Sequence, residues 1–215
     1  MATSTGDRHA PYCVAIVAMG PSRNEYLADC VAKSGRFQVA DETWAINAMA
    51  GVIEHDRAII MDDLPYFSKA ARAEQPALVG YGDWLHRHPG PMYTQKAYIQ
   101  YPGSIEYPLQ DVLNTVGYAY MNSTPAYALC LAIHMGVKHI KLYGMDYSNQ
   151  DGKFVEAGRA CMEFWIGIAH RQFGIKVSIA NTSTLMDQSK ARQLYGYSIA
   201  PEIAIQDGKF VVNIP

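Results

Sequence analysis

Four polar segments of this sequence each follow an apolar, strand-like run, and their side chains could bind a ligand. The segments are Gly20-Pro21-Ser22, Asn47, Asp62-Asp63 and Gly144-Met145-Asp146. In open α/β sheets ligands bind beyond the carboxyl ends of the strands, so we expect the four segments to converge on one edge. A helix start can hold an anion, an amide can bond a base or ribose, and paired carboxylates can hold a cation.

The first segment has the order expected of a strand, a tight turn and a helix. An apolar run from Val14 to Ala18 leads into Gly20-Pro21-Ser22 and then into helix-forming residues. Unpaired N–H groups and the helix dipole favour an anion at such a helix start. The turn has one glycine where the dinucleotide fingerprint needs three, and no Lys-Ser or Lys-Thr follows to make a P-loop. A plain connection between strand and helix has the same pattern.

Three further positions each have a binding interpretation and a structural one. Asn47 could bond a base or ribose through its amide, or bond its own backbone as a turn asparagine. Asp62-Asp63 could hold a divalent cation beside a phosphate, or cap the helix that Leu64-Pro65 begins. Ser123-Thr124 offers hydroxyl and N–H groups at a helix start, as a phosphate cradle or as an ordinary cap.

Other catalytic and metal-binding signatures are absent from the sequence. The seven histidines show no His-Glu-x-x-His spacing. His86 and His88 alternate about Arg87, but a pair alone is a weak indication of a metal site. No Gly-x-Ser-x-Gly nucleophile elbow is present, so the sequence does not indicate a hydrolase of that type.

Alternating strand-like and helix-like segments must position these residues. Strands are predicted at 14–18, 43–47, 57–61, 139–143 and 175–180, and helices at 26–33, 64–73, 124–135 and 156–172. This alternation predicts an α/β fold of three layers with a mainly parallel, Rossmann-like sheet. Asp207-Gly208 between two apolar runs predicts a C-terminal β-hairpin.

One region lacks this alternation. Residues 75–108 are rich in glycine, proline and aromatic residues, with short strands expected at 77–79 and 97–101. Long segments of this kind are usually functional, so we expect an insertion that covers the carboxyl ends of the strands. The chain of 215 residues suits one sizeable domain. We therefore expect a flexible lead at 1–12 and a single Rossmann-like domain at 13–215.

Composition disfavours several classes of protein. The net charge is −2 with no basic excess, which disfavours nucleic acid as a partner. The longest apolar runs are too short to cross a bilayer, and no signal peptide is expected. The four cysteines lack Cys-x-x-Cys spacing, which predicts reduced thiols in a cytoplasmic protein. A homo-oligomer is compatible with this composition.

Taken together, the segments resemble the motif set of a known superfamily. Its pattern is a strand, Gly-Asn-Gly-Pro-Ser, a strand ending in asparagine, a Ser-Gly helix start, and Ile-x-Leu-x-Gly-x-Asp-Tyr/Phe. Its members include single-domain bacterial sialyltransferases, flagellin-associated glycosyltransferase-like proteins and archaeal hydroxymethylpterin pyrophosphokinases. The matching residues here are Ala18-Met19-Gly20-Pro21-Ser22, Ala45-Ile46-Asn47, Asn122-Ser123-Thr124 and the block from Ala132 to Tyr147. The resemblance covers roughly residues 14–63 and 122–181.

The resemblance implies a Rossmann-like fold that binds a nucleotide-activated donor. It assigns the nucleotide to two groups of residues, namely Gly20, Pro21, Ser22 and Asn47 on one side and Ser123, Thr124, Gly144 and Asp146 on the other. The sequence departs from the pattern at three places. Ala18-Met19 replaces Gly-Asn, Thr124-Pro125 replaces Ser-Gly, and Glu156 or Ala157 stands where the sialyltransferases have a catalytic histidine. Sialyl transfer itself is therefore disfavoured.

The leading hypothesis is a glycosyltransferase-like transferase that uses a nucleotide or nucleotide-sugar donor. Asp146 or Glu156 would act as acid or base, and Arg159 or Arg23 would stabilise the departing phosphate. A first alternative is pyrophosphoryl or nucleotidyl transfer, with Mg²⁺ on Asp62-Asp63. A second alternative is a nucleotide-binding or sequestering protein without turnover. The acceptor is not specified by these residues.

Overall fold

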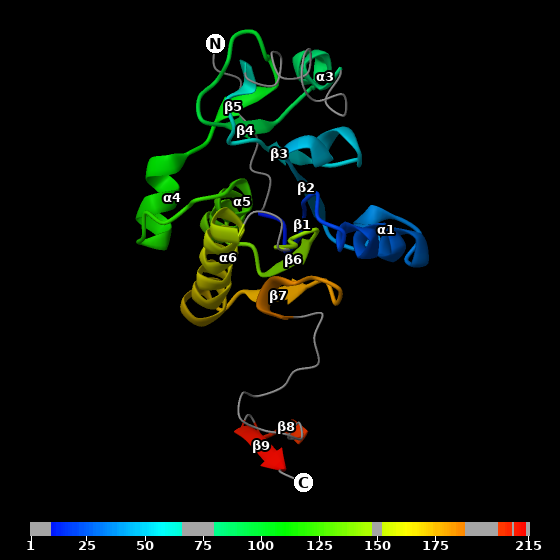
Figure 1. Ribbon diagram of the computed structural model, residues 1–215, viewed down its shortest axis with the longest axis vertical. Coiled ribbons are helices and arrows are strands. Elements are labelled where there is room, and N and C mark those ends of the chain that lie inside the picture. Colours follow the sequence, from blue (N-terminus) through cyan, green and yellow to red (C-terminus); the bar gives the residue numbers. More distant parts are fainter. Residues whose placement is uncertain (1–9, 66–79, 148–151, 188–201, 208, 214–215) are drawn as a thin grey trace.

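Seven parallel strands form one sheet in the computed structural model, which describes residues 10–65, 80–147, 152–187, 202–207 and 209–213. From one edge to the other the strands are β5 (Ser104–Glu106), β4 (Met92–Thr94), β3 (Arg57–Ile59), β2 (Glu42–Ile46), β1 (Cys13–Val17), β6 (His139–Tyr143) and β7 (Lys176–Ile179) (Figure 1). Every neighbouring pair is parallel. The chain leaves β1 toward β2 and later returns to β6 on the other side of β1. The switch point of the topology therefore lies between β1 and β6.

Helices cover both faces of this sheet (Figure 1). One face packs against α4 (Leu109–Val116), α5 (Thr124–His134) and α6 (Gly152–Phe173), and the other against α1 (Arg23–Ala32), η2 (Asn47–Gly51) and α3 (Tyr81–Arg87). Successive residues of β1 alternate between the two cores. Val14 and Ile16 belong to the first, and Ala15 and Val17 to the second. The predicted three-layer, parallel α/β fold is confirmed.

The segment at 75–108 contains two strands that the sequence analysis missed. Within its described part, from residue 80, α3 packs on the sheet, and β4 and β5 extend the sheet at its edge. The strand expected at 97–101 is wrong, because these residues form turns. That β4–β5 connection does reach the carboxyl end of β3, where Gln95 Nε2 donates to Met61 O at 2.6 Å. The strand expected at 77–79 lies outside the described residues.

The predicted C-terminal hairpin is confirmed as β8 (Glu202–Gln206) paired with antiparallel β9 (Lys209–Asn213). Of the helix predicted at 64–73, only its first two residues are described. Most of the expected lead at 1–12 is also outside the described residues. The described helices include none with the length and hydropathy needed to cross a membrane. The short helices η1 (Arg36–Gln38) and η4 (Leu185–Asp187) complete the described elements.

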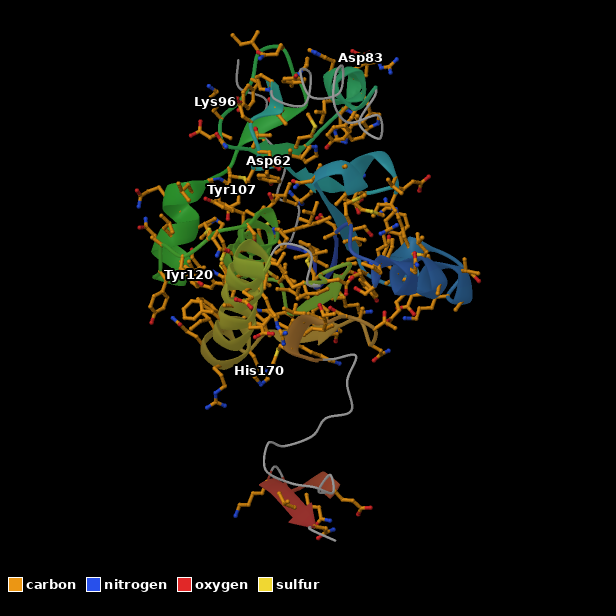
Figure 2. The ribbon with its side chains drawn as sticks, in the orientation of Figure 1. Asp62, Asp83, Lys96, Tyr107, Tyr120 and His170 are labelled. Carbon is orange, nitrogen blue, oxygen red and sulfur yellow. The ribbon has the colours of Figure 1, made fainter. Side chains whose placement is uncertain are left out.

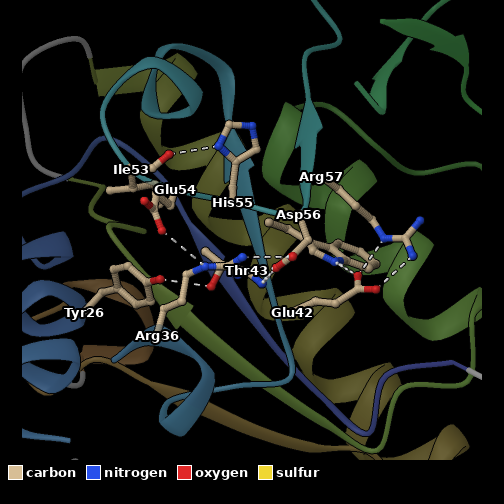
Figure 3. Close-up of polar contacts among 10 residues, drawn as sticks. Tyr26, Arg36, Glu42, Thr43, Ile53, Glu54, His55, Asp56 and Arg57 are labelled. Carbon is tan, nitrogen blue, oxygen red and sulfur yellow. Dashed lines mark hydrogen bonds and ion pairs between the residues drawn. The ribbon is translucent and has the colours of Figure 1, made fainter. Parts of the chain in front are cut away.

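A partly buried ion pair fixes the amino ends of β2 and β3 (Figure 3). Arg36 donates through Nη1 to Asp56 Oδ2 at 2.5 Å and through Nη2 to Asp56 Oδ1 at 3.1 Å. Asp56 Oδ2 also accepts from the Thr43 backbone N–H at 2.8 Å. A second bidentate pair joins Arg57 to Glu42 at 2.7 and 3.0 Å. These contacts set the register of the two strands, whose carboxyl ends carry Asn47 and Asp62.

Candidate functional site

The turns that follow β1 and β6 are bonded to each other at the switch point. The Ala18 N–H donates to Tyr143 O at 2.9 Å, and the Gly20 N–H donates to Gly144 O at 2.9 Å. Gly144 has a φ of 69°, a left-handed conformation that suits glycine. A Cβ on Gly20 would overlap the Asp146 carboxylate and the Gly144 carbonyl, so this position requires glycine as well. The two predicted segments do converge.

Asp146 binds the start of α1 with its own carboxylate. Its Oδ2 accepts from the Ser22 N–H at 2.7 Å, and its Oδ1 from the Thr184 N–H at 3.4 Å. In return, Ser22 Oγ accepts from the Gly144 N–H at 2.9 Å. The N-terminus of α1, where backbone N–H groups attract anions, is thus occupied by the Asp146 carboxylate of the protein itself. These contacts give Ser22 and Asp146 a positioning role, and their part in nucleotide binding or catalysis stays a prediction.

Arg23 is directed at the same turn. Its Nη1 donates to the carbonyls of Met19 and Gly20. A guanidinium on two carbonyls neutralises their partial charge and closes the turn from the helix side. Its use toward a departing phosphate stays a prediction.

Asn47 has a strained backbone and an unpaired acceptor. It follows β2 directly and has a φ of 50°, which few residues other than glycine adopt, although asparagine is among the more tolerant. Its Oδ1 is buried without a hydrogen-bond partner. A buried acceptor left unpaired costs about 1–3 kcal/mol. The self-bonded turn asparagine that the sequence left open does not account for this oxygen.

A second group of polar atoms lies where the start of α5 meets the end of β6. The hydroxyls of Ser123 and Tyr147 are both buried and near each other, without a hydrogen bond of good geometry. Burial raises the pKa of Tyr147, and the Ser123 hydroxyl opposes that rise. Gly158 of α6 makes room for the tyrosine ring, since a Cβ there would lie 2.9 Å from it. Asn122 Nδ2 joins this loop to Ala157 O at 2.9 Å.

The sequence analysis did not assign Tyr147 a role of its own. The available signal was its position, directly after the strand-ending Asp146. The neighbouring predicted residue Thr124 is buried at the start of α5. Its presence there agrees with the predicted helix start, and a ligand contact stays a prediction.

The remaining candidates on α6 differ in exposure. Glu156 is exposed on the second turn of the helix. Arg159 donates through Nε to Glu163 Oε1 at 2.8 Å, and the same oxygen accepts from the Met186 N–H at 2.8 Å. Arg159 thus helps to hold the segment after β7 against α6. Of the two acid or base candidates, Glu156 is exposed, whereas Asp146 is partly buried.

The proposed cation ligands lie at the carboxyl end of β3 (Figure 2). Asp62 and Asp63 are both exposed. Asp63 Oδ1 accepts from the Tyr98 hydroxyl at 2.8 Å, and burial together with this carboxylate raises the pKa of Tyr98 to about 12. Within the described ranges, no three histidine, cysteine or acidic side chains are grouped as metal ligands. A magnesium site at Asp62-Asp63 stays a prediction.

The overall fold can be compared with solved structures. It matches the sialyltransferase CstII from Campylobacter jejuni, in complex with the substrate analogue CMP-3FNeuAc, with a TM-score of 0.50. The match has 13% identity over 81% of this chain and 82% of that one. The fold is sialyltransferase-like. At this identity the likeness shows the fold and not the chemistry.

Two further CstII structures align at lower similarity. One, with cytidine-5'-monophosphate, has a TM-score of 0.37 and 14% identity over 82% of this chain and 83% of that one. The other, with a trisaccharide acceptor and CMP, has a TM-score of 0.37 and 13% identity over 81% and 84%. No family model and no curated protein matches the sequence.

Proposed function

We propose that this protein is a glycosyltransferase-like transferase that binds a nucleotide-sugar donor at the carboxyl edge of its sheet. The observation that carries the proposal is the unpaired, buried Oδ1 of Asn47 at the end of β2. Strain and unpaired polar atoms are costly, and they gather at sites where a ligand relieves them. A nucleoside can relieve this one, because its amino and hydroxyl groups donate hydrogen bonds.

The sialyltransferase-like fold supports the choice of donor. The structure with TM-score 0.50 was determined with a CMP-sugar analogue. Cytosine carries an exocyclic amino group, which is the kind of donor that Asn47 Oδ1 lacks. We therefore propose a cytidine nucleotide as the donor's activating group. Within this proposal Glu156 is the general base for the acceptor hydroxyl, because its carboxylate is accessible.

The test is donor binding by the Asn47→Gly variant. Glycine tolerates a φ of 50° and removes only the amide, so the fold should be retained. Calorimetric titration with CMP and with a CMP-sugar should give a Kd at least 10-fold weaker than that of the wild-type protein. Asn114→Ala is the matched control, because Asn114 is exposed on α4 and should leave the Kd unchanged.

Each outcome separates the proposal from its alternatives. If neither protein binds any nucleotide, the donor site is wrong. If binding requires Mg²⁺ and is lost in Asp62→Ala, the protein is a phosphoryl or nucleotidyl transferase. If the donor binds but is never consumed with any offered acceptor, the protein sequesters nucleotides. Equal affinity in Asn47→Gly and wild type would show that Asn47 does not contact the donor.

A further inference from the structure

Two histidines meet near the amino ends of β3 and β4. The candidate site lies at the opposite, carboxyl ends of the strands. His55 lies between η2 and β3, and His88 lies between α3 and β4. Their Nε2 atoms are 2.9 Å apart, and the rings are nearly coplanar, with 15° between them. One of the two nitrogens must carry the hydrogen and the other must accept it. This contact joins the side chains of the two turns.

The backbone on either side fixes which nitrogen carries each hydrogen. The Gly90 N–H donates to His88 Nδ1 at 2.9 Å, so that nitrogen is an acceptor without hydrogen. Neutral His88 then carries its hydrogen on Nε2 and donates it to His55 Nε2. Neutral His55 carries its hydrogen on Nδ1 and donates it to Ile53 O at 2.9 Å (Figure 3). The three bonds form one chain that requires both rings to be neutral.

A proton added to either ring breaks this chain. On His55 it would go to Nε2, which would then face the N–H of His88 at 2.9 Å. On His88 it would go to Nδ1, which would then face the N–H of Gly90. A metal ion bound to His88 Nε2 would move the ring's hydrogen to Nδ1, where it would face the Gly90 N–H.

The surroundings of the pair offer little stabilisation to a positive charge. His88 is 7% exposed, and Trp84 packs edge-on against it at 4.7 Å, backed by Tyr81. Burial, reinforced by His55, lowers the pKa of His88 to about 4.

Among the described residues, the charged groups near the pair lie on the turn before β3, on η1 and on α3. Before β3, the Asp56 carboxylate interacts electrostatically with His55, but it is ion-paired with Arg36 of η1. The neighbouring Glu54 side chain is 93% exposed. On α3, the side chains of Asp83, His86 and Arg87 are exposed, and His86 Nδ1 is engaged with Gln100 O. The Asp56 carboxylate is thus already compensated by Arg36.

We propose that the His55–His88 pair is an acid-sensitive latch, closed when both rings are neutral, that joins the η2–β3 turn to the α3–β4 turn. Protonation of either ring separates the pair, and protonation of His88 also frees the Gly90 N–H. Strand β4 begins two residues later, at Met92, whose N–H bonds Gly103 O ahead of β5. Acid therefore loosens strands β4 and β5 at the end of the sheet, while α5, on the opposite face of the sheet from α3, keeps its protection.

The first test uses the full-length protein and reads the ring nitrogens directly. Long-range ¹H–¹⁵N NMR should show His88 as the Nε2–H form and His55 as the Nδ1–H form at pH 7. The His88 ring should stay neutral down to about pH 5, well below the ordinary histidine pKa of about 6.5. A hydrogen on His88 Nδ1 at pH 7, or a His88 ring that titrates near 6.5, would overturn the proposal.

The second test counts the protons that open the latch. Hydrogen exchange of the amides in β4 is followed from pH 7 to pH 4.5, corrected for intrinsic rates. Between pH 6 and 5 two histidines that charge only on opening increase the opened fraction about 60-fold. His55→Gln keeps an acceptor for His88 but removes one titrating ring, so its increase should be about 8-fold.

His170→Gln is the matched control, because His170 is exposed on α6 (Figure 2), which packs on the opposite face of the sheet from α3. In this variant, hydrogen exchange of the β4 amides should depend on pH as in the wild-type protein. If His55→Gln shows the same dependence as the wild-type protein, other groups drive the opening and the latch is rejected. Should His55→Gln not fold, the ring-nitrogen measurement on the wild-type protein decides alone.

Discussion

Single residues at the switch point are held by one another rather than left open for a ligand. The Asp146 carboxylate takes the position at the start of α1 that a phosphate would otherwise take. Buried polar atoms without a hydrogen-bond partner lie elsewhere, on the Asn47 amide oxygen and on the Ser123 and Tyr147 hydroxyls. Within the proposed function these two hydroxyls can donate to a phosphate, whereas the Gly20-Pro21-Ser22 turn is already bonded to Asp146.

Gly20→Ala tests how tightly the Gly20-Pro21-Ser22 turn packs against the turn that follows β6. The new Cβ would overlap the Asp146 carboxylate and the Gly144 carbonyl, and the latter is backbone that cannot move aside cheaply. Overpacking of this kind costs about 1–3 kcal/mol of unfolding free energy. Urea denaturation should show that loss.

Gly167→Ala is the matched control for this substitution. Gly167 lies inside α6 with open space around its Cα, so alanine should raise stability by about 0.5–1 kcal/mol. A Gly20→Ala protein as stable as the wild type would contradict the packing derived for the turn.

Among the elements, β2 and β3 are joined at their amino ends by the Arg36–Asp56 and Arg57–Glu42 ion pairs. Asp56→Ala removes the partner of Arg36 and of the Thr43 N–H together. It leaves a half-buried guanidinium unpaired, so we expect a loss of about 2–3 kcal/mol at pH 7. Glu54→Ala is the control, because Glu54 is exposed and 3.9 Å from Arg36, and should cost under about 0.5 kcal/mol.

The effect of Asp56→Ala should also depend on pH. Burial opposes ionisation of Asp56, but hydrogen bonds from Arg36 and Thr43 outweigh it and lower the pKa of Asp56. A lowered folded pKa stabilises the protein above the unfolded value, about 3.9, and that contribution is lost as pH falls through the folded pKa. The difference between variant and wild type should therefore shrink below about pH 4. A difference that does not shrink at all as the pH falls below about 4 would mean that packing, not charge, is lost.

The elements that sequence could predict are those with strong local signals. Apolar runs gave β1, β2, β6 and β7 to within one or two residues, and Pro125 marked the start of α5. Strands β4 and β5 were missed because three residues each are too few for periodicity and pair only through long-range contacts. The convergence of Gly20 with Gly144 followed from topology alone.

Other features of the site depend on partners distant in sequence. That Asp146 binds Ser22, 124 residues away, is not visible in either segment. The unpaired state of Asn47 and the meeting of His55 with His88 likewise require the folded chain. His88 was weighed with His86 as a metal pair, and its actual partner comes from another turn.

On the scale of the whole molecule, the proposed donor site lies at the carboxyl ends of the strands and the proposed histidine latch at their amino ends. Trp44 pairs with Arg57 and Ile46 with Ile59, so Asn47 and His55 are separated by about five residues along the strands. At about 3.3 Å per residue this is roughly 16 Å. Substitutions that far apart without shared partners have additive effects on stability, usually within about 0.5 kcal/mol.

The free energy of unfolding of the double variant Asn47→Gly with His55→Gln should therefore change by the sum of the two single changes. His55→Gln alone should bind the donor within about twofold of the wild-type Kd at pH 7, because its ring is remote from the carboxyl edge. Urea denaturation of the four proteins measures the first expectation, and calorimetric titration the second. An interaction energy above about 1 kcal/mol, or a donor Kd that follows latch opening, would show that the sheet transmits strain between its two edges.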